Sequence, residues 1–191
     1  MLYSRRISAS GRRAVSSSAA LKGLGGLHLA DFIKLVEDVT PFNSKFLGLK
    51  VVTCEKSKLV CELKMKEEFI GRRDNKVLHG GIAAAAIDHV GGFASWTALD
   101  DRHTMLSTVD LRIDYITPAP YETLLVIGQV VSVSKQLIRA DVTVQTKSGT
   151  VIAIGRGLYN CYKGGIDMRA AMAGPAFSTQ DESNCGKRGE Q

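Results

Sequence analysis

The spacing of apolar residues divides the chain into stretches with helical and with strand periods. Between Leu29 and Val36, apolar residues recur at roughly helical spacing, and Pro41 ends this pattern, which predicts a short helix. Two apolar runs at 47–54 and 59–65 flank the polar sequence 55–58. They predict two strands joined by a hairpin turn.

The longest apolar segment covers residues 77–99 and has Asp88 and His89 near its middle. A membrane span would place the Asp88 carboxylate in hydrocarbon at a heavy cost in free energy. We therefore expect a helix buried inside a protein core, and no membrane span.

After residue 101 the pattern changes, and between 109 and 115 apolar residues alternate with charged ones, as in a strand with one buried face. Three more strands are expected at 124–134, 138–146 and 151–162. A helix without a charged face must be covered by such strands. The order predicts an α+β fold in which a curved antiparallel sheet wraps around one long buried helix.

The terminal segments differ from the rest of the chain in composition. Residues 1–26 are rich in Arg, Ser and Ala and contain five basic residues but no acid. This composition is typical of a mitochondrial transit peptide, which predicts a location in the matrix; the alternative is a disordered basic tail. We expect a single domain at 27–163 and, because residues 164–191 lack periodicity, a flexible C-terminal tail.

The charge distribution argues against nucleic acid as a partner. The whole chain has 25 basic and 19 acidic residues and a net charge of +6. Most of the excess lies in residues 1–26, so the expected domain is nearly neutral.

The four cysteines predict neither a metal site nor a disulfide framework. They form no Cys-x-x-Cys pair and have no histidine at zinc-ligand spacing. We expect small buried hydrophobic residues or inert thiols at Cys54, Cys61, Cys161 and Cys185.

Asp88 is the candidate for acid–base chemistry, because it is the only carboxylate between Asp74 and Asp100 and has apolar neighbours on both sides. Burial of a carboxylate without a partner raises its pKa, which is how a general base near neutral pH arises. The alternative is a structural carboxylate paired with His89, Arg112 or a helix end, and both interpretations stay open.

Gly80 and Gly81 lie where the expected helix starts. Free backbone N–H groups there could hold a developing oxyanion, although tight packing explains two glycines equally well. Gly81 and Asp88 are seven residues apart, or roughly 10 Å along a helix. One helix can hardly bring both groups to a single reacting atom, so we expect a homodimer or a dimer of dimers with active sites at the dimer interface.

Neighbouring residues have candidate supporting roles. His79 precedes the helix, and we expect it to fix the loop by hydrogen bonding rather than to act as a base. Ser107 and Thr108 begin the following strand, and either hydroxyl could orient a water molecule beside Asp88. A Ser-His-Asp hydrolase is not indicated, because the Gly-x-Ser-x-Gly elbow is absent.

The sequences VLHGGIAAAAID at 77–88 and VDLRIDYITPA at 109–119 resemble those of the hotdog-fold thioesterases. The relatives in question are the phenylacetic-acid-pathway enzyme and the mammalian mitochondrial thioesterase superfamily members. The resemblance covers residues 45–163. It implies the hotdog fold and hydrolysis of an acyl-CoA thioester by a homodimer or dimer of dimers. No cofactor or metal is expected, since coenzyme A is part of the substrate.

The resemblance also implies roles for individual residues. Asp88 would activate water or attack the carbonyl directly. The N–H of Gly80 would polarise the thioester carbonyl, and Thr108 would hold the water.

One position departs from the pattern of the family. Many relatives carry Asn or Gln six or seven residues before the motif histidine, where this chain has Arg73 and Arg72. Asn75 could take this part if the loop is rearranged, or the loop 71–76 could hold the CoA phosphates. Further substrate contacts are expected from Gly81, Phe93 and Trp96, with Tyr115 as another candidate for the pocket wall.

Two other functions remain as alternatives. A non-catalytic module that binds acyl-CoA or an acyl-carrier protein would fit the departure at Arg72 and Arg73. A hotdog hydratase or dehydratase would need a catalytic histidine placed with an acid. Only His89 beside Asp88 suggests this, and adjacent helical residues point in different directions.

Overall fold

The computed structural model describes residues 24–74, 76–101 and 103–163. The helical elements are η1 (Leu24–Gly26), α1 (Leu29–Lys34), η2 (Leu35–Val39), η3 (Phe42–Leu47), η4 (Glu67–Phe69) and α2 (Gly80–Thr97). The strands are β1 (Lys50–Glu55), β2 (Lys58–Leu63), β3 (Ile70–Arg72), β4 (Val77–Leu78), β5 (Thr104–Tyr115), β6 (Leu124–Val133), β7 (Leu137–Thr146) and β8 (Val151–Lys163).

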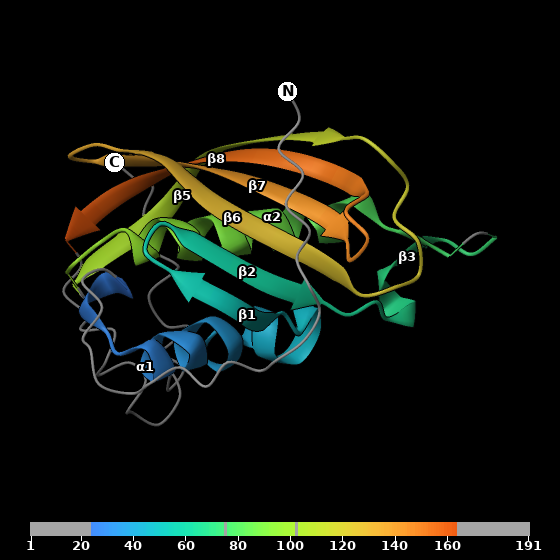
Figure 1. Cartoon of the computed structure of the whole chain (residues 1–191), viewed down its shortest axis with the longest axis horizontal. Coiled ribbons are helices and arrows are strands. Elements are labelled where there is room, and N and C mark those ends of the chain that lie inside the picture. Colours follow the sequence, from blue (N-terminus) through green and yellow to red (C-terminus); the bar gives the residue numbers. More distant parts are fainter. Residues whose placement is uncertain (1–23, 75, 102, 164–191) are drawn as a thin grey trace, which may run out of the picture.

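Six of the strands form one antiparallel sheet in the order β1-β2-β6-β7-β8-β5, and α2 packs against one face of it (Figure 1). This arrangement confirms the predicted α+β hotdog architecture. The helices α1, η2 and η3 lie beside β1 and α2. β3 and β4 form a separate small hairpin just before α2.

The first helical segment ends before Pro41, as the pattern predicts, since Thr40 has an extended backbone, but a second helical segment that was not expected follows it. η2 continues α1 to Val39, and η3 places Leu47 in a helical turn, so that the first strand begins at Lys50. Proline precedes the first turn of η3, where its missing N–H breaks no helical hydrogen bond. The buried Asn43 side chain connects this segment to the backbone on both sides. Its Nδ2 donates to Val36 O at 3.0 Å, and its Oδ1 accepts from Leu49 N at 2.8 Å.

The segment 77–99 also divides differently from the expectation. Val77 and Leu78 form β4, and the helix begins at Gly80. The hairpin of β3 and β4 has too few residues to show a period in the sequence. β5 begins at Thr104, five residues before the alternation of apolar and charged residues that starts at 109. Its first residues pair with the end of β8, although the adjacent apolar residues Met105 and Leu106 break the alternating pattern.

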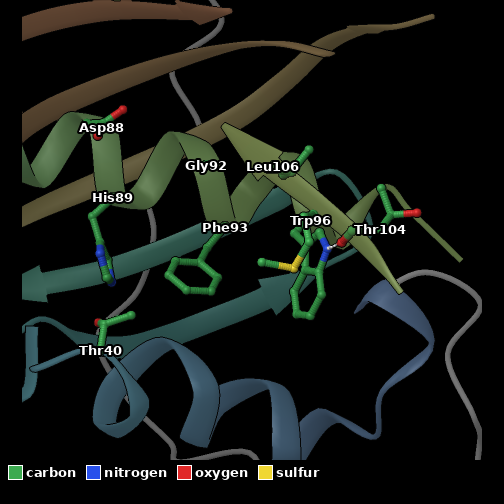
Figure 2. A pocket seen from close by; sticks show the side chains of 9 residues that line it. Thr40, Asp88, His89, Gly92, Phe93, Trp96, Thr104 and Leu106 are labelled. Carbon is green, nitrogen blue, oxygen red and sulfur yellow. Dashed lines mark hydrogen bonds between the residues drawn. The ribbon is translucent and has the colours of Figure 1, made fainter. Parts of the chain in front are cut away.

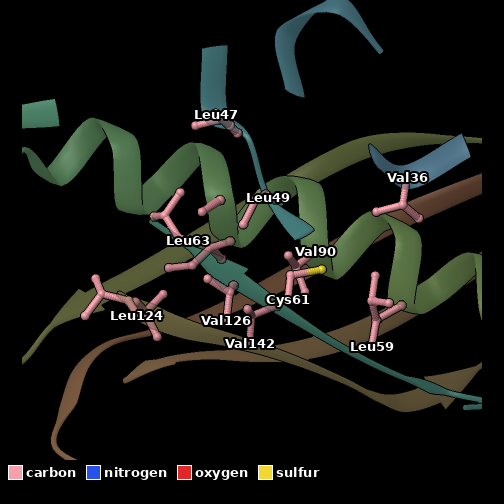
Figure 3. Packing of buried hydrophobic residues seen from close by; sticks show 14 of the residues in the cluster. Val36, Leu47, Leu49, Leu59, Cys61, Leu63, Val90, Leu124, Val126 and Val142 are labelled. Atoms are coloured by element: carbon pink, nitrogen blue, oxygen red, sulfur yellow. The ribbon is translucent and has the colours of Figure 1, made fainter. Parts of the chain in front are cut away.

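One hydrophobic core joins the sheet, α2 and the N-terminal helices (Figure 3). Leu24 is part of this core, although it falls within the range predicted as a leader. Residues 1–23 and 164–191, which hold most of the predicted leader and the whole predicted tail, lie outside the described residues. Among the helices that the structure describes, none has the length and apolar character to span a membrane.

Glycines on the sheet allow α2 to approach it closely. A Cβ on Gly155 of β8 would clash with Ile87 Cγ2, and a Cβ on Gly128 of β6 would lie 2.9 Å from the Cβ of Ala94. Ile87 and Ala94 are fully buried in these contacts. The depth of α2 on the sheet is therefore set by the missing side chains below it.

The opposite face of α2 is less covered than expected. Ala84, Ala85, Asp88 and Gly92 are only partly buried within the chain. The expected burial of the helix is incomplete on this face within one chain, because the sheet covers one side of α2 and the N-terminal helices cover another.

Replacing Gly155 with Ala tests the close contact between α2 and the sheet. The added methyl overlaps Ile87, so we expect the free energy of unfolding to fall by about 1–3 kcal/mol in urea denaturation. Gly92→Ala is the matched control, because a Cβ there would contact Tyr159 Cε1 at an ordinary 3.5 Å. In an Ile87→Ala background, Gly155→Ala should cost less, and an equal cost in both backgrounds would contradict this contact.

Candidate active site

Asp88 lies in the middle of α2 on its partly exposed face, next to Thr108 of β5. The Thr108 hydroxyl donates a hydrogen bond to Asp88 Oδ1 at 2.8 Å. A threonine hydroxyl has one proton and two lone pairs, so Thr108 can still accept a hydrogen bond from water beside the carboxylate. The pair combines a base with a group that can hold the water to be activated.

The surroundings of Asp88 differ from those expected from its apolar neighbours. These neighbours predicted a buried carboxylate that was either unpartnered or paired with His89, Arg112 or a helix end. The carboxylate is instead partly exposed and bonded to Thr108. Arg112 is placed elsewhere on β5, with Asp114 at 3.4 Å as its ion-pair partner.

Tyr159 of β8 forms a hydrogen bond with the backbone of Asp88 on the side of α2 that faces the sheet. Its side chain is 1% exposed, and its hydroxyl donates to the Asp88 carbonyl oxygen at 3.3 Å. A Cβ on Gly91 would clash with this hydroxyl, so the missing side chain makes room for the phenol under the helix. Burial, followed by the nearby Asp88 charge, raises the pKa of Tyr159, which keeps it a neutral donor.

The start of α2 has one backbone donor without a partner. His79 caps the helix: its Nδ1 accepts from the Gly81 N–H at 3.0 Å, and its carbonyl oxygen accepts from the Ile82 N–H at 3.0 Å. Within the part of the chain that the structure describes, the Gly80 N–H has no acceptor. Gly80 can therefore donate to a ligand, whereas the Gly81 N–H is already used.

Tyr115, at the end of β5, contacts Gly80 directly. Its hydroxyl donates to the Gly80 carbonyl oxygen at 3.1 Å, and its ring would lie 3.3 Å from a Cβ at position 80. A pocket of about 350 Å³ opens here, lined by Gly80, Tyr115, Arg72 and the segment 116–119 among others. Tyr115 thus lies at the Gly80 end of α2 and not beside Asp88.

The loop before α2 brings the Arg72 cation to this pocket. Arg72 lines it and pairs with Asp74 at 2.5 Å. Arg73 is exposed, and the ammonium group of Lys76 lies 3.5 Å from Glu67. Asn75, the other candidate for contact with the substrate carbonyl, lies outside the described residues.

A second pocket, of about 310 Å³, lies beside Asp88 (Figure 2). Both side chains expected to contact the substrate, Phe93 and Trp96, line it. Its remaining lining comes from α2, from β5 and from the end of η2, at His89, Gly92, Thr104, Met105, Leu106 and Thr40. With these residues the pocket suits an apolar group next to the carboxylate.

His89 is held away from acid–base chemistry with Asp88. Its Nε2 lies 3.2 Å from Val36 O, so this nitrogen carries a proton and donates to the N-terminal segment. Its ring packs on Phe93 with centroids 4.8 Å apart, and burial lowers the pKa of the imidazole. A neutral histidine engaged in this way does not serve the hydratase alternative.

Gly80 and Asp88 do not converge within one chain. They are eight residues apart on α2, or about 12 Å along the helix axis. They also line two pockets that share no residue. Each chain therefore carries two partial sites, one with a backbone donor and one with a carboxylate.

The thiols are not placed for catalysis. Cys54, Cys61 and Cys161 are free, and burial raises the pKa of each, which lowers the thiolate fraction. Cys185 lies outside the described residues. No group of three or more His, Cys, Asp or Glu side chains among the described residues could hold a metal ion.

Several contacts at the two pockets were not found from the sequence. Thr40 reaches the pocket of Asp88 through the helical turns of the N-terminal segment, for which no pattern exists. Tyr159 and its hydrogen bond depend on how α2 crosses β8. The pair Gly155 and Gly157 on β8, whose missing side chains make room for Ile87 and for the Tyr159 hydroxyl, was the available indication of this close crossing.

The chain is similar to known proteins over the region that contains these residues. The profile of the thioesterase superfamily matches residues 75–153. A protein of Saccharolobus solfataricus inferred to be an esterase is 32% identical over 124 residues, which cover 63% of this chain and 86% of that protein. Acyl-coenzyme A thioesterase 13 of Mus musculus is 28% identical over 131 residues, or 68% of this chain and 91% of the relative.

Solved structures agree with this similarity. The crystal structure of zebrafish thioesterase superfamily member 2 has a TM-score of 0.62 and 27% sequence identity, and the match covers 70% of this chain and 98% of that one. The match to the superfamily profile includes both Gly80 and Asp88.

Proposed function

The chain belongs to the thioesterase superfamily and is a thioester hydrolase, and on this premise we propose that it cleaves acyl-CoA to a free acid and CoA with Asp88 as the general base. The observation that carries this proposal is the hydrogen bond between Thr108 and Asp88 at the side of an apolar pocket. The acyl group lies in that pocket, and water is the second substrate.

The reaction needs only protein groups and water. Asp88 takes a proton from a water molecule that Thr108 holds, while the water oxygen bonds to the thioester carbon. The carbonyl electron pair moves onto oxygen, and the N–H of a Gly80 donates to this oxyanion. The C=O bond then forms again as the C–S bond breaks, and the leaving CoA thiolate takes the proton from Asp88.

We also propose a homodimer, or a dimer of such dimers, in which each site combines Asp88 of one chain with Gly80 of the partner subunit. The separation of the two groups along α2 supports this assignment. The edge position of β5 supports it as well, because among the described strands only β8 pairs with it. Val109 on β5 and Ile116 just after it are 58% and 56% exposed, so a partner could bury them.

The remaining contacts follow from charge and composition. The Arg72 cation lines the Gly80 pocket, and Arg73 and Lys76 are exposed in the same loop; together they suit the phosphates of CoA. The composition of residues 1–26 supports a place in the mitochondrial matrix.

Asp88→Asn tests the general base. The amide keeps the size of the side chain but cannot take a proton, so we expect kcat to fall by about 100-fold to 10,000-fold with the fold intact. The measurement is release of free CoA from a panel of acyl-CoAs, with circular dichroism as the control for folding. Unchanged turnover would refute the mechanism. If the wild-type chain binds acyl-CoA without releasing CoA, it is a binding module and not an enzyme.

Gly80→Pro tests the backbone donor without disturbing the helix. Gly80 is the first residue of α2, where proline is tolerated, and the preceding His79 has the extended conformation that proline requires (φ −66°, ψ 130°). Loss of the N–H should lower kcat by about 100-fold to 1,000-fold. Gly80→Ala is the matched control, since it brings a Cβ to Tyr115 but keeps the N–H. Equal activity of the two variants would exclude Gly80 as the oxyanion donor.

A further inference from the structure

The pocket beside Asp88 follows α2 toward the end of the helix. Asp88, Gly92 and Trp96 all line it and succeed one another at intervals of four residues, which makes a stripe that turns by about 40° around the helix at each step. In Figure 2 the Trp96 ring lies on the same side of the helix as His89 and Phe93, and the Asp88 carboxylate projects from another side. From Asp88 to Trp96 the stripe measures about 12 Å. Phe93 and Leu106 provide apolar side walls between them.

Trp96 closes the far end of this stripe and is firmly held. Its Nε1 donates to the Thr104 carbonyl oxygen at 2.8 Å, and its ring stacks on Phe32 at 6.0 Å with an angle of 28°. The residue is only 4% exposed. The indole is therefore fixed from two sides and has little freedom to move aside for a longer ligand.

Gly92 lies halfway along the stripe, and packing against the rest of the chain does not require a glycine at this position. A Cβ there would meet only Tyr159, at an ordinary contact distance of 3.5 Å, and its φ is not in the left-handed region. The neighbouring Gly91 differs, because a Cβ on it would clash with the Tyr159 hydroxyl. Packing within the chain therefore explains Gly91 but not Gly92, which lines the pocket without a side chain.

We propose that Trp96 and Gly92 set the length of the acyl group. This rests on the proposed thioesterase function, because it takes the reacting carbonyl to lie at Asp88. An extended alkyl chain advances about 1.3 Å per carbon, given C–C bonds of about 1.5 Å, so the stripe of about 12 Å holds an unbranched chain of roughly eight to ten carbons. Each further CH₂ buried below this limit raises kcat/KM about threefold to fourfold. Longer chains meet the indole.

Two substitutions should move the preferred chain length in opposite directions. Trp96→Leu removes the end wall, so we expect the optimum of kcat/KM to move to chains about two to four carbons longer. Gly92→Leu fills the pocket about 6 Å from the carbonyl. Its optimum should fall to about four to six carbons, with at least a 10-fold loss on ten-carbon acyl-CoA.

The measurement is kcat/KM by CoA release for straight-chain acyl-CoAs from four to sixteen carbons. Leu124→Ala, which truncates a buried side chain that does not line the pocket, is the control and should keep the wild-type profile. General destabilisation lowers all rates but cannot move the optimum in two directions.

The outcomes separate this proposal from the one on which it rests. Hydrolysis of no acyl-CoA by the wild-type chain would refute the thioesterase function itself. Wild-type hydrolysis with the same optimum in both variants would overturn the assignment of Trp96 and Gly92. If Trp96→Leu does not fold, Gly92→Leu alone decides: a shorter optimum supports the proposal and an unchanged one overturns it.

Discussion

The close approach of α2 to the sheet is the constraint on which the rest of the structure depends. The helix lies over strand positions without side chains, so that Ile87 packs on the backbone of Gly155 and the phenol of Tyr159 fits beneath Gly91. Because Tyr159 also donates to the Asp88 carbonyl oxygen, the contact that fixes the depth of the helix also fixes the residue that carries the carboxylate. The orientation of Asp88 toward Thr108 follows from this packing.

A rigid helix also fixes the distance between the two kinds of chemistry that it carries. Among the described residues, the N–H of Gly80 at the helix start has no acceptor, whereas the next N–H bonds to His79. The Asp88 carboxylate lies two turns further on. No movement of side chains brings the Gly80 N–H close to the Asp88 carboxylate of the same helix. If both act on one thioester, as we propose, they come from different chains, and the partly exposed face of α2 is where the chains meet.

Period and composition predicted the elements that have enough residues to show a period. α2, the four strands after it and the hairpin of β1 and β2 were found from spacing, and the motif around Gly80 and Asp88 indicated the family. The helical turns at 42–47 were missed because they depend on the buried Asn43 side chain, whose amide nitrogen donates to Val36 O and whose oxygen accepts from Leu49 N. The exposure of Asp88 was missed because an apolar sequence predicts burial but does not specify which neighbour provides it. The hydrogen bond that fixes the Trp96 indole was not predicted either, because its acceptor is the Thr104 carbonyl oxygen, whose position only the folded chain shows.

The central claim is a site shared between two chains, and mixed dimers test it most directly. Asp88→Asn and Gly80→Pro chains are purified separately, mixed under conditions that exchange subunits, and assayed for CoA release. A mixed dimer with shared sites has one intact site and one that carries both changes, so the pool should recover about one quarter of wild-type activity. If the mixture remains as inactive as its two parents, each site lies within a single chain and the account is wrong.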